Sequence, residues 1–195
     1  MEDGEQALAY AQADFEEPNR LFVELFQSRF PSWTEKGTIL DLGCGPGDIC
    51  LRLARTFPEC GVDGLDGSAA MIDLARRALV GSGLENRVRF IQGLVPGARL
   101  PESLYQAVTS NSLLHHLHEP QVLWRSLRAL GRPGALVLIM DLMRPASAGW
   151  AAALVATYAP DAPEVLRQDF NNSLLAAFEP AEVTAQLRQA DLDHV

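Results

Sequence analysis

The stretch "ILDLGCGPGDIC", residues 39–50, runs from four mainly apolar residues into a loop with three glycines and then into a helix-like pattern. Glycine lets a ligand approach the backbone without meeting a Cβ atom. The loop has the spacing G-x-G-x-G instead of the G-x-G-x-x-G that is typical of dinucleotide sites, and no Lys-Ser/Thr pair follows as in a P-loop. Asp48 next to the glycines is unfavourable beside a pyrophosphate. The loop is therefore predicted to hold an uncharged or cationic part of a ligand, with a tight turn that binds nothing as the alternative.

Outside this loop, short apolar runs alternate with amphipathic segments. Strands alternating with helices predict an α/β protein with a parallel sheet, helices on both faces and right-handed crossovers. Ser68 is expected to cap the helix that follows the second strand. The predicted strands are 38–43, 60–66, 87–93, 105–112 and 132–142, and the predicted helices are 18–30, 48–57, 69–79, 120–130 and 180–190.

A second clue is Asp66, which closes the second predicted strand 19 residues after Gly47. An acid at that place can accept hydrogen bonds from both hydroxyl groups of a ribose. The alternative is an aspartate that only caps a helix or a turn. Together with the glycine loop, Asp66 favours a nucleoside site.

Composition narrows the class of protein. The 195 residues suffice for one domain, and the net charge of −9 argues against a general binder of nucleic acids or anionic membranes. The acidic start lacks the features of a signal peptide, and the longest apolar runs are too short to span a membrane, so a cytoplasmic protein is expected. Three cysteines without a C-x-x-C pair predict neither a disulfide framework nor a zinc site.

Five segments in order resemble the motifs of class I S-adenosylmethionine (SAM)-dependent methyltransferases. They are "ILDLGCGPGD", "VDGLDGSAAMIDLAR", "RVRFIQG", "SNSLLHHLHEP" and "RALGRPGALVLIMDLMRP". Within that family, the motifs resemble those of small-molecule enzymes of the methyltransferase-domain-11 or ubiquinone/menaquinone-biosynthesis type. The resemblance covers residues 36–145 strongly and implies a Rossmann-like sheet of strand order 3-2-1-4-5. It further implies one domain over 1–195, with a helical lid (1–35), a cofactor-binding core (36–142) and a helical substrate side (143–195).

The resemblance also assigns roles to individual residues. Asp41 and the glycine loop would hold the methionine end of SAM, Asp66 the ribose, and Gly93 with its neighbours the adenine. The cofactor-binding residues implied in this way are Asp41, Gly43, Cys44, Gly45, Gly47, Asp66, Gly67, Gly93, Leu94, Asn111 and Leu113.

The sequence departs from the family pattern at three places, one of which is Gln106, where the family commonly has an aspartate before the fourth strand. Leu94 stands where the family usually has an acid that receives the adenine amino group, and a leucine cannot accept that hydrogen bond. The family also continues into a sixth and a seventh strand, which are missing here, so the apolar fifth strand is expected to form a sheet edge. Natural proteins normally cover such an edge. The helices of 143–179 or a second subunit could cover it, or the chain is a truncated form, and the hypothesis adopted is a homodimer across the edge.

Candidate catalytic residues are His115 and His116, which follow the fourth strand. A base is needed only if the methyl acceptor must lose a proton. Structural packing, loop capping and a metal site are the alternatives for these histidines. Residues expected on the substrate side are Tyr10, Asp141, Trp150, Tyr158 and Asn171.

Three functional hypotheses follow. The first is SAM-dependent methyl transfer to a small-molecule acceptor, leaving S-adenosylhomocysteine (SAH). The second is a methyltransferase fold that binds SAM weakly or not at all and serves as an interaction module. The third, a nicotinamide-dependent oxidoreductase, is disfavoured by the glycine spacing and by Asp48.

Overall fold

The computed structural model describes residues 15–31, 33, 36–101 and 104–192. The chain divides into two compact units. The sheet unit holds the described residues up to Asn111 together with Ser126–Met140, and the helical unit holds Ser112–Arg125 and the described residues from Asp141 onward. The prediction of a single domain over the whole chain stays a prediction.

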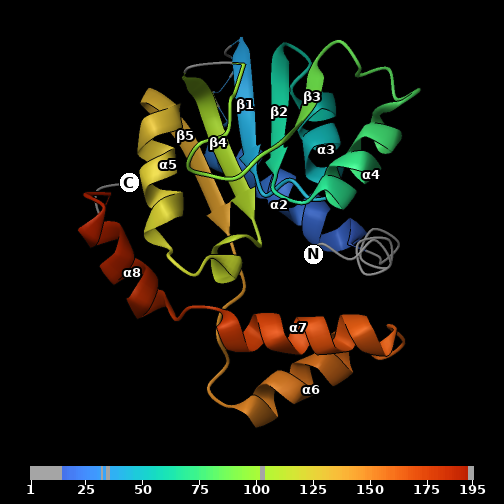
Figure 1. Ribbon diagram of the computed structural model, residues 1–195, viewed down its shortest axis with the longest axis vertical. Helices are drawn as coiled ribbons and strands as arrows, with labels where there is room; N and C mark the ends of the chain where they lie inside the picture. The colour runs from blue at the N-terminus through green and yellow to red at the C-terminus, as the bar shows by residue number, and fades with distance from the viewer. Residues whose placement is uncertain (1–14, 32, 34–35, 102–103, 193–195) are drawn as a thin grey trace. The chain divides into compact units, whose positions relative to one another are not determined.

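The sheet unit is built on five parallel strands in the order β3-β2-β1-β4-β5 (Figure 1). The prediction of this fold and strand order is confirmed. The connection after β1 steps one way across the sheet and the connection after β4 steps the other way, and open α/β sheets bind ligands outside the carboxyl ends of two such strands. The strands are β1 (Gly37–Leu42), β2 (Cys60–Asp66), β3 (Val88–Gln92), β4 (Tyr105–Asn111) and β5 (Gly131–Met140).

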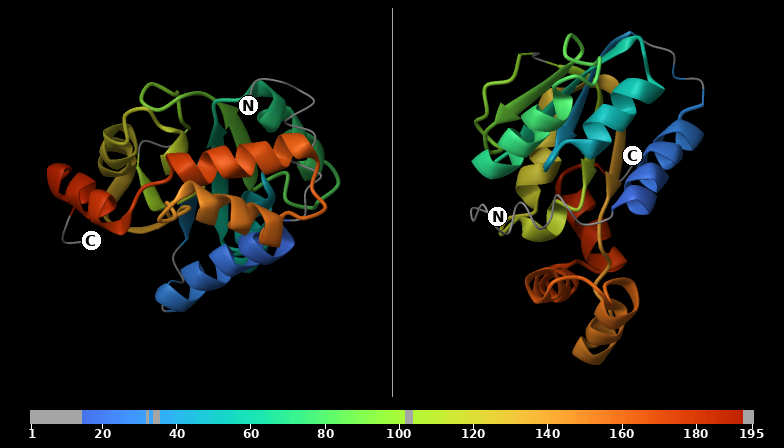
Figure 2. Two further views of the ribbon diagram at one scale, coloured as in Figure 1. Left: turned by 90° about the horizontal axis from the view of Figure 1, so that it is seen from below. Right: turned by 90° about the vertical axis from the view of Figure 1, so that its right-hand side faces the viewer.

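Helices cover both faces of this sheet. The connections through α3 (Asp48–Thr56) and α4 (Ala69–Leu79) step one way across the sheet, and the connection through α5 (Gln121–Leu130) steps the other way. Right-handed crossovers therefore place α3 and α4 on one face and the part of α5 in this unit on the other (Figures 1 and 2). The predicted cap of α4 is confirmed, since the Ser68 side chain accepts a hydrogen bond from the Met71 amide.

The helix α2 (Glu16–Arg29) packs against α3. Its Phe22 and Phe26 are fully buried in the core, where Phe26 makes edge-to-face contacts with Trp33 and Phe57. Leu21 of the same helix is exposed.

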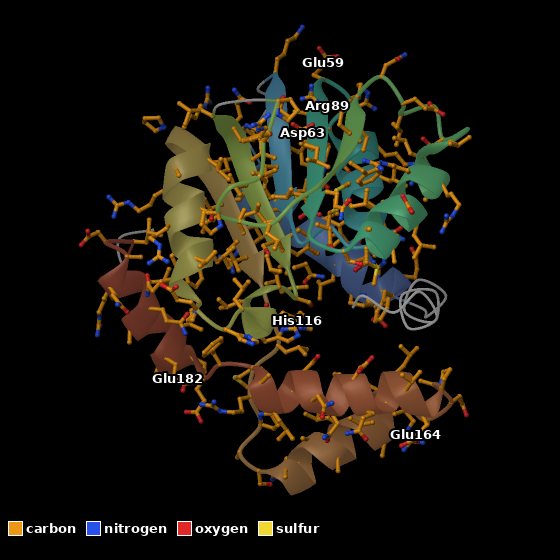
Figure 3. All side chains as sticks on the ribbon, viewed as in Figure 1. Glu59, Asp63, Arg89, His116, Glu164 and Glu182 are labelled. Atoms are coloured by element: carbon orange, nitrogen blue, oxygen red, sulfur yellow. The ribbon has the colours of Figure 1, made fainter. Side chains whose placement is uncertain are left out.

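An ion pair joins the buried Asp63, in the middle of β2, to the partly exposed Arg89 near the start of β3 (Figure 3). The carboxylate of Asp63 is inaccessible to solvent and accepts two hydrogen bonds from the Arg89 guanidinium, at 2.6 and 3.0 Å. The hydroxyl of Tyr105 donates a third, at 2.9 Å. Because a buried carboxylate is costly unless it is paired and hydrogen-bonded, these partners are what allows Asp63 to lie in the core.

The helical unit contains the short helix η1 (Leu114–His116) and the helices α6 (Ala148–Tyr158), α7 (Glu164–Ala176) and α8 (Pro180–Gln189). A small core of Ala151, Val155 and Leu174 joins α6 to α7. No helix among the described residues is both long and apolar enough to cross a membrane.

Candidate functional site

The glycine loop follows β1, and its backbone amides are all accounted for. Gly43 and Cys44 donate to the carbonyl of Leu65 at 2.8 and 3.1 Å. Gly45 donates to a carboxylate oxygen of Asp66, and Gly47 donates to the carbonyl of Cys44. Pro46 has no amide hydrogen to offer. The loop therefore holds itself in place with the donors that a phosphate-binding loop would present to its ligand, which argues against a pyrophosphate in this site.

The three glycines of the loop serve two different needs. All have positive φ, +73° at Gly43, +52° at Gly45 and +88° at Gly47, a region that other residues adopt only with strain. A Cβ on Gly47 would lie 2.5 Å from the Phe90 ring, so this glycine is required for packing. A Cβ on Gly45 would meet no atom of the described residues within 4 Å. Gly45 therefore borders open space, as expected where a ligand approaches the backbone.

Asp66 closes β2 as predicted and lies directly beside this open space. One carboxylate oxygen accepts from the Gly45 amide at 2.9 Å, and the other accepts from the Ser68 amide at 2.8 Å. An ionised carboxylate has about four acceptor positions. Two positions therefore remain for the two hydroxyl groups of a ribose, and the half-buried side chain is within reach of solvent.

Asp41 lies beneath the loop. Its side chain is almost fully buried, and its carboxylate accepts hydrogen bonds from Thr109 at 2.8 Å and from the Cys50 thiol at 3.3 Å. Burial raises the pKa of Asp41 from 3.8 to about 6, against the opposing effect of these two hydrogen bonds. Its predicted role in holding the amino group of the cofactor stays a prediction. Sequence reasoning missed Thr109 and Cys50, because each reads as an ordinary strand or helix residue.

The side chain of Cys44 contributes to packing. Its side chain is buried, and a Cβ on Gly64 would lie 2.9 Å from the sulfur atoms of both Cys44 and Cys50. The two thiols thus fill the space over a glycine of β2. The contribution of Cys44 to a ligand site is limited to its backbone in this arrangement.

Three further predicted residues lie at the ends of β2 and β3. The Gly93 amide donates to the carbonyl of Asp66 at 2.9 Å. The side chain of Leu94 lies over Gly67, where a Cβ would come within 2.5 Å of a leucine methyl group. The carboxyl ends of neighbouring strands in the sheet unit therefore bring together the glycine loop, Asp66, Gly67, Gly93 and Leu94.

Asn111, the last residue of β4, has a buried side-chain oxygen without a hydrogen-bond partner among the described residues. Buried polar atoms normally have partners, and an exception points to a missing ligand or water. Asn111 thus fits its predicted place beside the cofactor. Leu113, two residues on, is half-buried in the helical unit.

Within the helical unit, His115 and Asp141 form a pair that was not predicted. The Nδ1 atom of His115 lies 2.6 Å from one oxygen of Asp141. The same carboxylate accepts from the amides of Leu114 and Leu142, which fix its orientation. The two residues were expected in separate roles. The clue that joins them is that each closely follows the carboxyl end of one of two neighbouring parallel strands, β4 and β5.

The other nitrogen of His115, Nε2, is buried and has no hydrogen-bond partner among the described residues. With Nδ1 donating to Asp141, Nε2 carries the lone pair, which is the arrangement of a general base. The ring of His116, which also belongs to η1, lies against the ring of His115 in a tilted arrangement, with centroids 4.0 Å apart and planes at 41° (Figure 3). Partial burial and the neighbouring His115 lower the pKa of His116.

The remaining substrate-side predictions are not brought to a common site. Trp150 and Tyr158 lie on α6 with largely exposed side chains, and Asn171 lies half-buried on α7. Tyr10 lies outside the described residues. Asp48, the acid beside the glycine loop, accepts hydrogen bonds from Asn19 and Arg52 and so ties α2 to α3.

Comparisons with known proteins agree with this geometry. A family model described as a methyltransferase domain matches residues 39–134. A ubiquinone biosynthesis O-methyltransferase of Pectobacterium carotovorum is 32% identical over 121 residues, which are 62% of this chain and 49% of that protein. The ubiquinone/menaquinone biosynthesis C-methyltransferase UbiE of Geobacter sulfurreducens is 30% identical over 117 residues, 59% of this chain and 45% of that protein. The chain thus spans about half the length of the curated relatives it matches.

Among solved structures, the plantazolicin methyltransferase BpumL, in complex with a pentazolic desmethylPZN analog and SAH, superposes with a TM-score of 0.75. The match covers 95% of this chain and 68% of BpumL at 17% identity, and it shows a shared fold. Family model, relatives and sheet topology coincide on the segment that holds the glycine loop and Asp66. The segment 39–134 belongs to the methyltransferase-domain family, and its methyltransferase relatives support the resemblance to class I SAM-dependent methyltransferases.

Proposed function

We propose that this chain binds SAM at the carboxyl ends of the strands and transfers its methyl group to a small-molecule acceptor. The observation that carries the proposal is the open space at Gly45 beside the half-buried carboxylate of Asp66. The amides of the glycine loop donate hydrogen bonds to other groups of the protein, so the site suits a nucleoside whose attached group is uncharged or cationic. A nicotinamide dinucleotide, whose pyrophosphate needs such donors, fits poorly.

SAM supplies an electrophilic methyl group on a sulfonium sulfur. Asp66 would accept hydrogen bonds from the ribose hydroxyls, and Gly45 would leave room for the ligand beside the loop. The buried oxygen of Asn111 would accept a hydrogen bond from a donor group of the ligand. These residues bind and align, and alignment is most of what an in-line methyl transfer requires.

His115 is proposed as the general base. Its Nε2 would take the proton of a hydroxyl or amine acceptor, and Asp141 would hold the ring in the required tautomer and stabilise the imidazolium that forms. Asp141 acts through His115 and is a positioning residue. The small size of the acceptor is supported by the ubiquinone-type relatives, whose names refer to O- and C-methylation in quinone biosynthesis.

The test is a methyl-transfer assay with labelled SAM against a panel of phenols, catechols and amines. The expected result is transfer of the labelled methyl group to at least one acceptor. His115→Gln should lose about 10²- to 10⁴-fold in kcat while SAH affinity is retained. Asp141→Asn should lose less and shift the pH profile. SAH binding without transfer to any acceptor would favour the interaction-module hypothesis.

A homodimer over the β5 edge is part of the proposal. Within the described sheet β5 pairs with β4 alone, and Leu136–Met140 are only partly buried although they are apolar. Exposed apolar edges are normally covered, and a second copy would supply a strand or helix to do so. Sedimentation should show a dimer at micromolar concentration. A monomer that persists at high concentration would contradict this part.

A further inference from the structure

Leu94 is an unusual residue for its place in the site. Its side chain is 73% exposed, although it lies in the turn directly after the third strand of a nucleoside-binding edge. A methyl group of Leu94 occupies the space over Gly67, the residue after Asp66. The Leu94 carbonyl accepts from the Ala98 amide at 3.0 Å, so the turn that presents this side chain is hydrogen-bonded and defined.

The position of a bound base follows from Asp66. β2 lies between β1 and β3, so a ribose on Asp66 has the glycine loop on one side and the end of β3 on the other. The base and the amino-acid tail leave a ribose from different carbons, and the proposed function places the tail at the glycine loop. The base is thereby directed to the β3 side, where Gly93 donates to the carbonyl of Asp66 and Leu94 covers Gly67.

Adenine has one hydrogen-bond donor on its edge, the 6-amino group. A carboxylate that received this group would form a charge-assisted hydrogen bond and reject bases without it by roughly tenfold or more. The leucine side chain offers no acceptor, and its high exposure leaves water to solvate the amino group. The amino group is then hydrogen-bonded to water in the bound ligand as it is in the free ligand. Removing it from the ligand therefore changes the binding affinity little.

We propose that Leu94 makes the site indifferent to the 6-amino group of adenine, so that it accepts adenosyl ligands in which this group is absent or alkylated. The chemical class is that of SAM and SAH analogues modified at purine position 6. The inference rests on the proposed function, because it requires a ribose on Asp66. It deepens that function by naming Leu94 as a specificity-determining residue.

The experiment compares SAH with two analogues by calorimetric titration. One analogue carries unsubstituted purine in place of adenine, and the other carries N6,N6-dimethyladenine. Both keep the ring nitrogens and the ribose, so they report on the amino group alone. The wild type should bind all three within about threefold of each other. Leu94→Asp, which is similar in size, should prefer SAH over both analogues by roughly tenfold or more.

A matched control is Leu104→Asp. Leu104 is another exposed leucine, located just before β4 and therefore at the opposite ends of the strands. This variant adds the same charge and should leave the ratio of affinities unchanged. The side chain of Gln92, exposed at the end of β3, is the neighbouring group able to accept from an amino group, and Gln92→Leu measures its share.

Each outcome decides a different point. A wild-type preference for SAH above tenfold would overturn the inference while leaving the proposed function intact. An unchanged ratio in Leu94→Asp would overturn the assignment of this position to the base. Failure of SAH itself to bind the wild type would overturn the proposed function and the inference with it.

Discussion

Gly45→Ala should separate ligand binding from folding. The substitution adds one methyl group at a residue with φ +52°, where a Cβ would meet no atom within 4 Å in the part of the chain that the structure describes. The cost to folding is therefore the backbone strain of a left-handed alanine, about 1–2 kcal/mol. The cost to binding is larger in kind, because the methyl group enters the space that the ligand should fill.

The loss of affinity can be estimated from overpacking. Inserting one methyl-sized group into a close-packed contact typically costs about 1–3 kcal/mol, which corresponds to roughly five- to 150-fold in Kd. Calorimetric titration with SAH measures this loss, and urea unfolding measures stability. Gly45→Ala should thus fold at the experimental temperature, lose about 1–2 kcal/mol of stability, and bind SAH at least roughly fivefold more weakly.

Gly81→Ala is the matched control. Gly81 also has a positive φ, +75°, and also has no atom within 4 Å of an added Cβ, but it follows α4, away from the carboxyl ends of the strands. It should lose similar stability and keep full affinity. If Gly45→Ala and Gly81→Ala bind SAH equally well, the open space at Gly45 is not the ligand site and the reasoning fails.

Three further predictions concern carboxylates. Asp66→Ala should lower SAH affinity by roughly 100-fold or more, since two hydrogen bonds to a charged acceptor are lost at about 1.5–3 kcal/mol each; a loss below fivefold in calorimetry would contradict its role. For Asp41, whose folded pKa of about 6 exceeds the ordinary 3.8, the native state holds more protons than the unfolded state between these values, so its contribution favours folding at low pH and is lost as pH rises to about 6. Asp41→Asn should therefore gain stability relative to the wild type from pH 4 to 7 in urea unfolding, by up to about 3 kcal/mol, and a constant difference would refute the raised pKa. Tyr105→Phe removes one hydrogen bond from the buried Asp63 and should lower the free energy of unfolding by about 1.5–3 kcal/mol. A decrease below roughly 0.5 kcal/mol would show that water replaces the hydroxyl.

The strands of the sheet could be predicted from the sequence because local sequence patterns determine them. Alternating apolar runs and helical segments predicted five strands within one or two residues of their observed bounds. Gly131 lies between the predicted helix 120–130 and the predicted strand 132–142, and it is the first residue of β5. The chain continues directly from α5 into the strand, so a glycine at that junction carries no signal for either element.

The candidate site was predictable where one residue carries the function and not where a pair does. Gly45 and Asp66 were found by their spacing along the chain, and the hydrogen bond between them fits that prediction. The pairing of His115 with Asp141 depends on the register of two strands, which no local pattern encodes. The partners of Asp41 escaped for the same reason, since Thr109 lies 68 positions away along the chain.

The most direct test of the account is calorimetric titration of the wild-type chain with SAH, beside NAD as a comparison. The account predicts binding of SAH at roughly micromolar Kd, about −8 kcal/mol, and no detectable heat from NAD. The internal use of the loop amides and the position of Asp66 both lead to this outcome. Heat from NAD with none from SAH would contradict the central claim that the glycine loop holds an adenosyl ligand with an amino-acid tail.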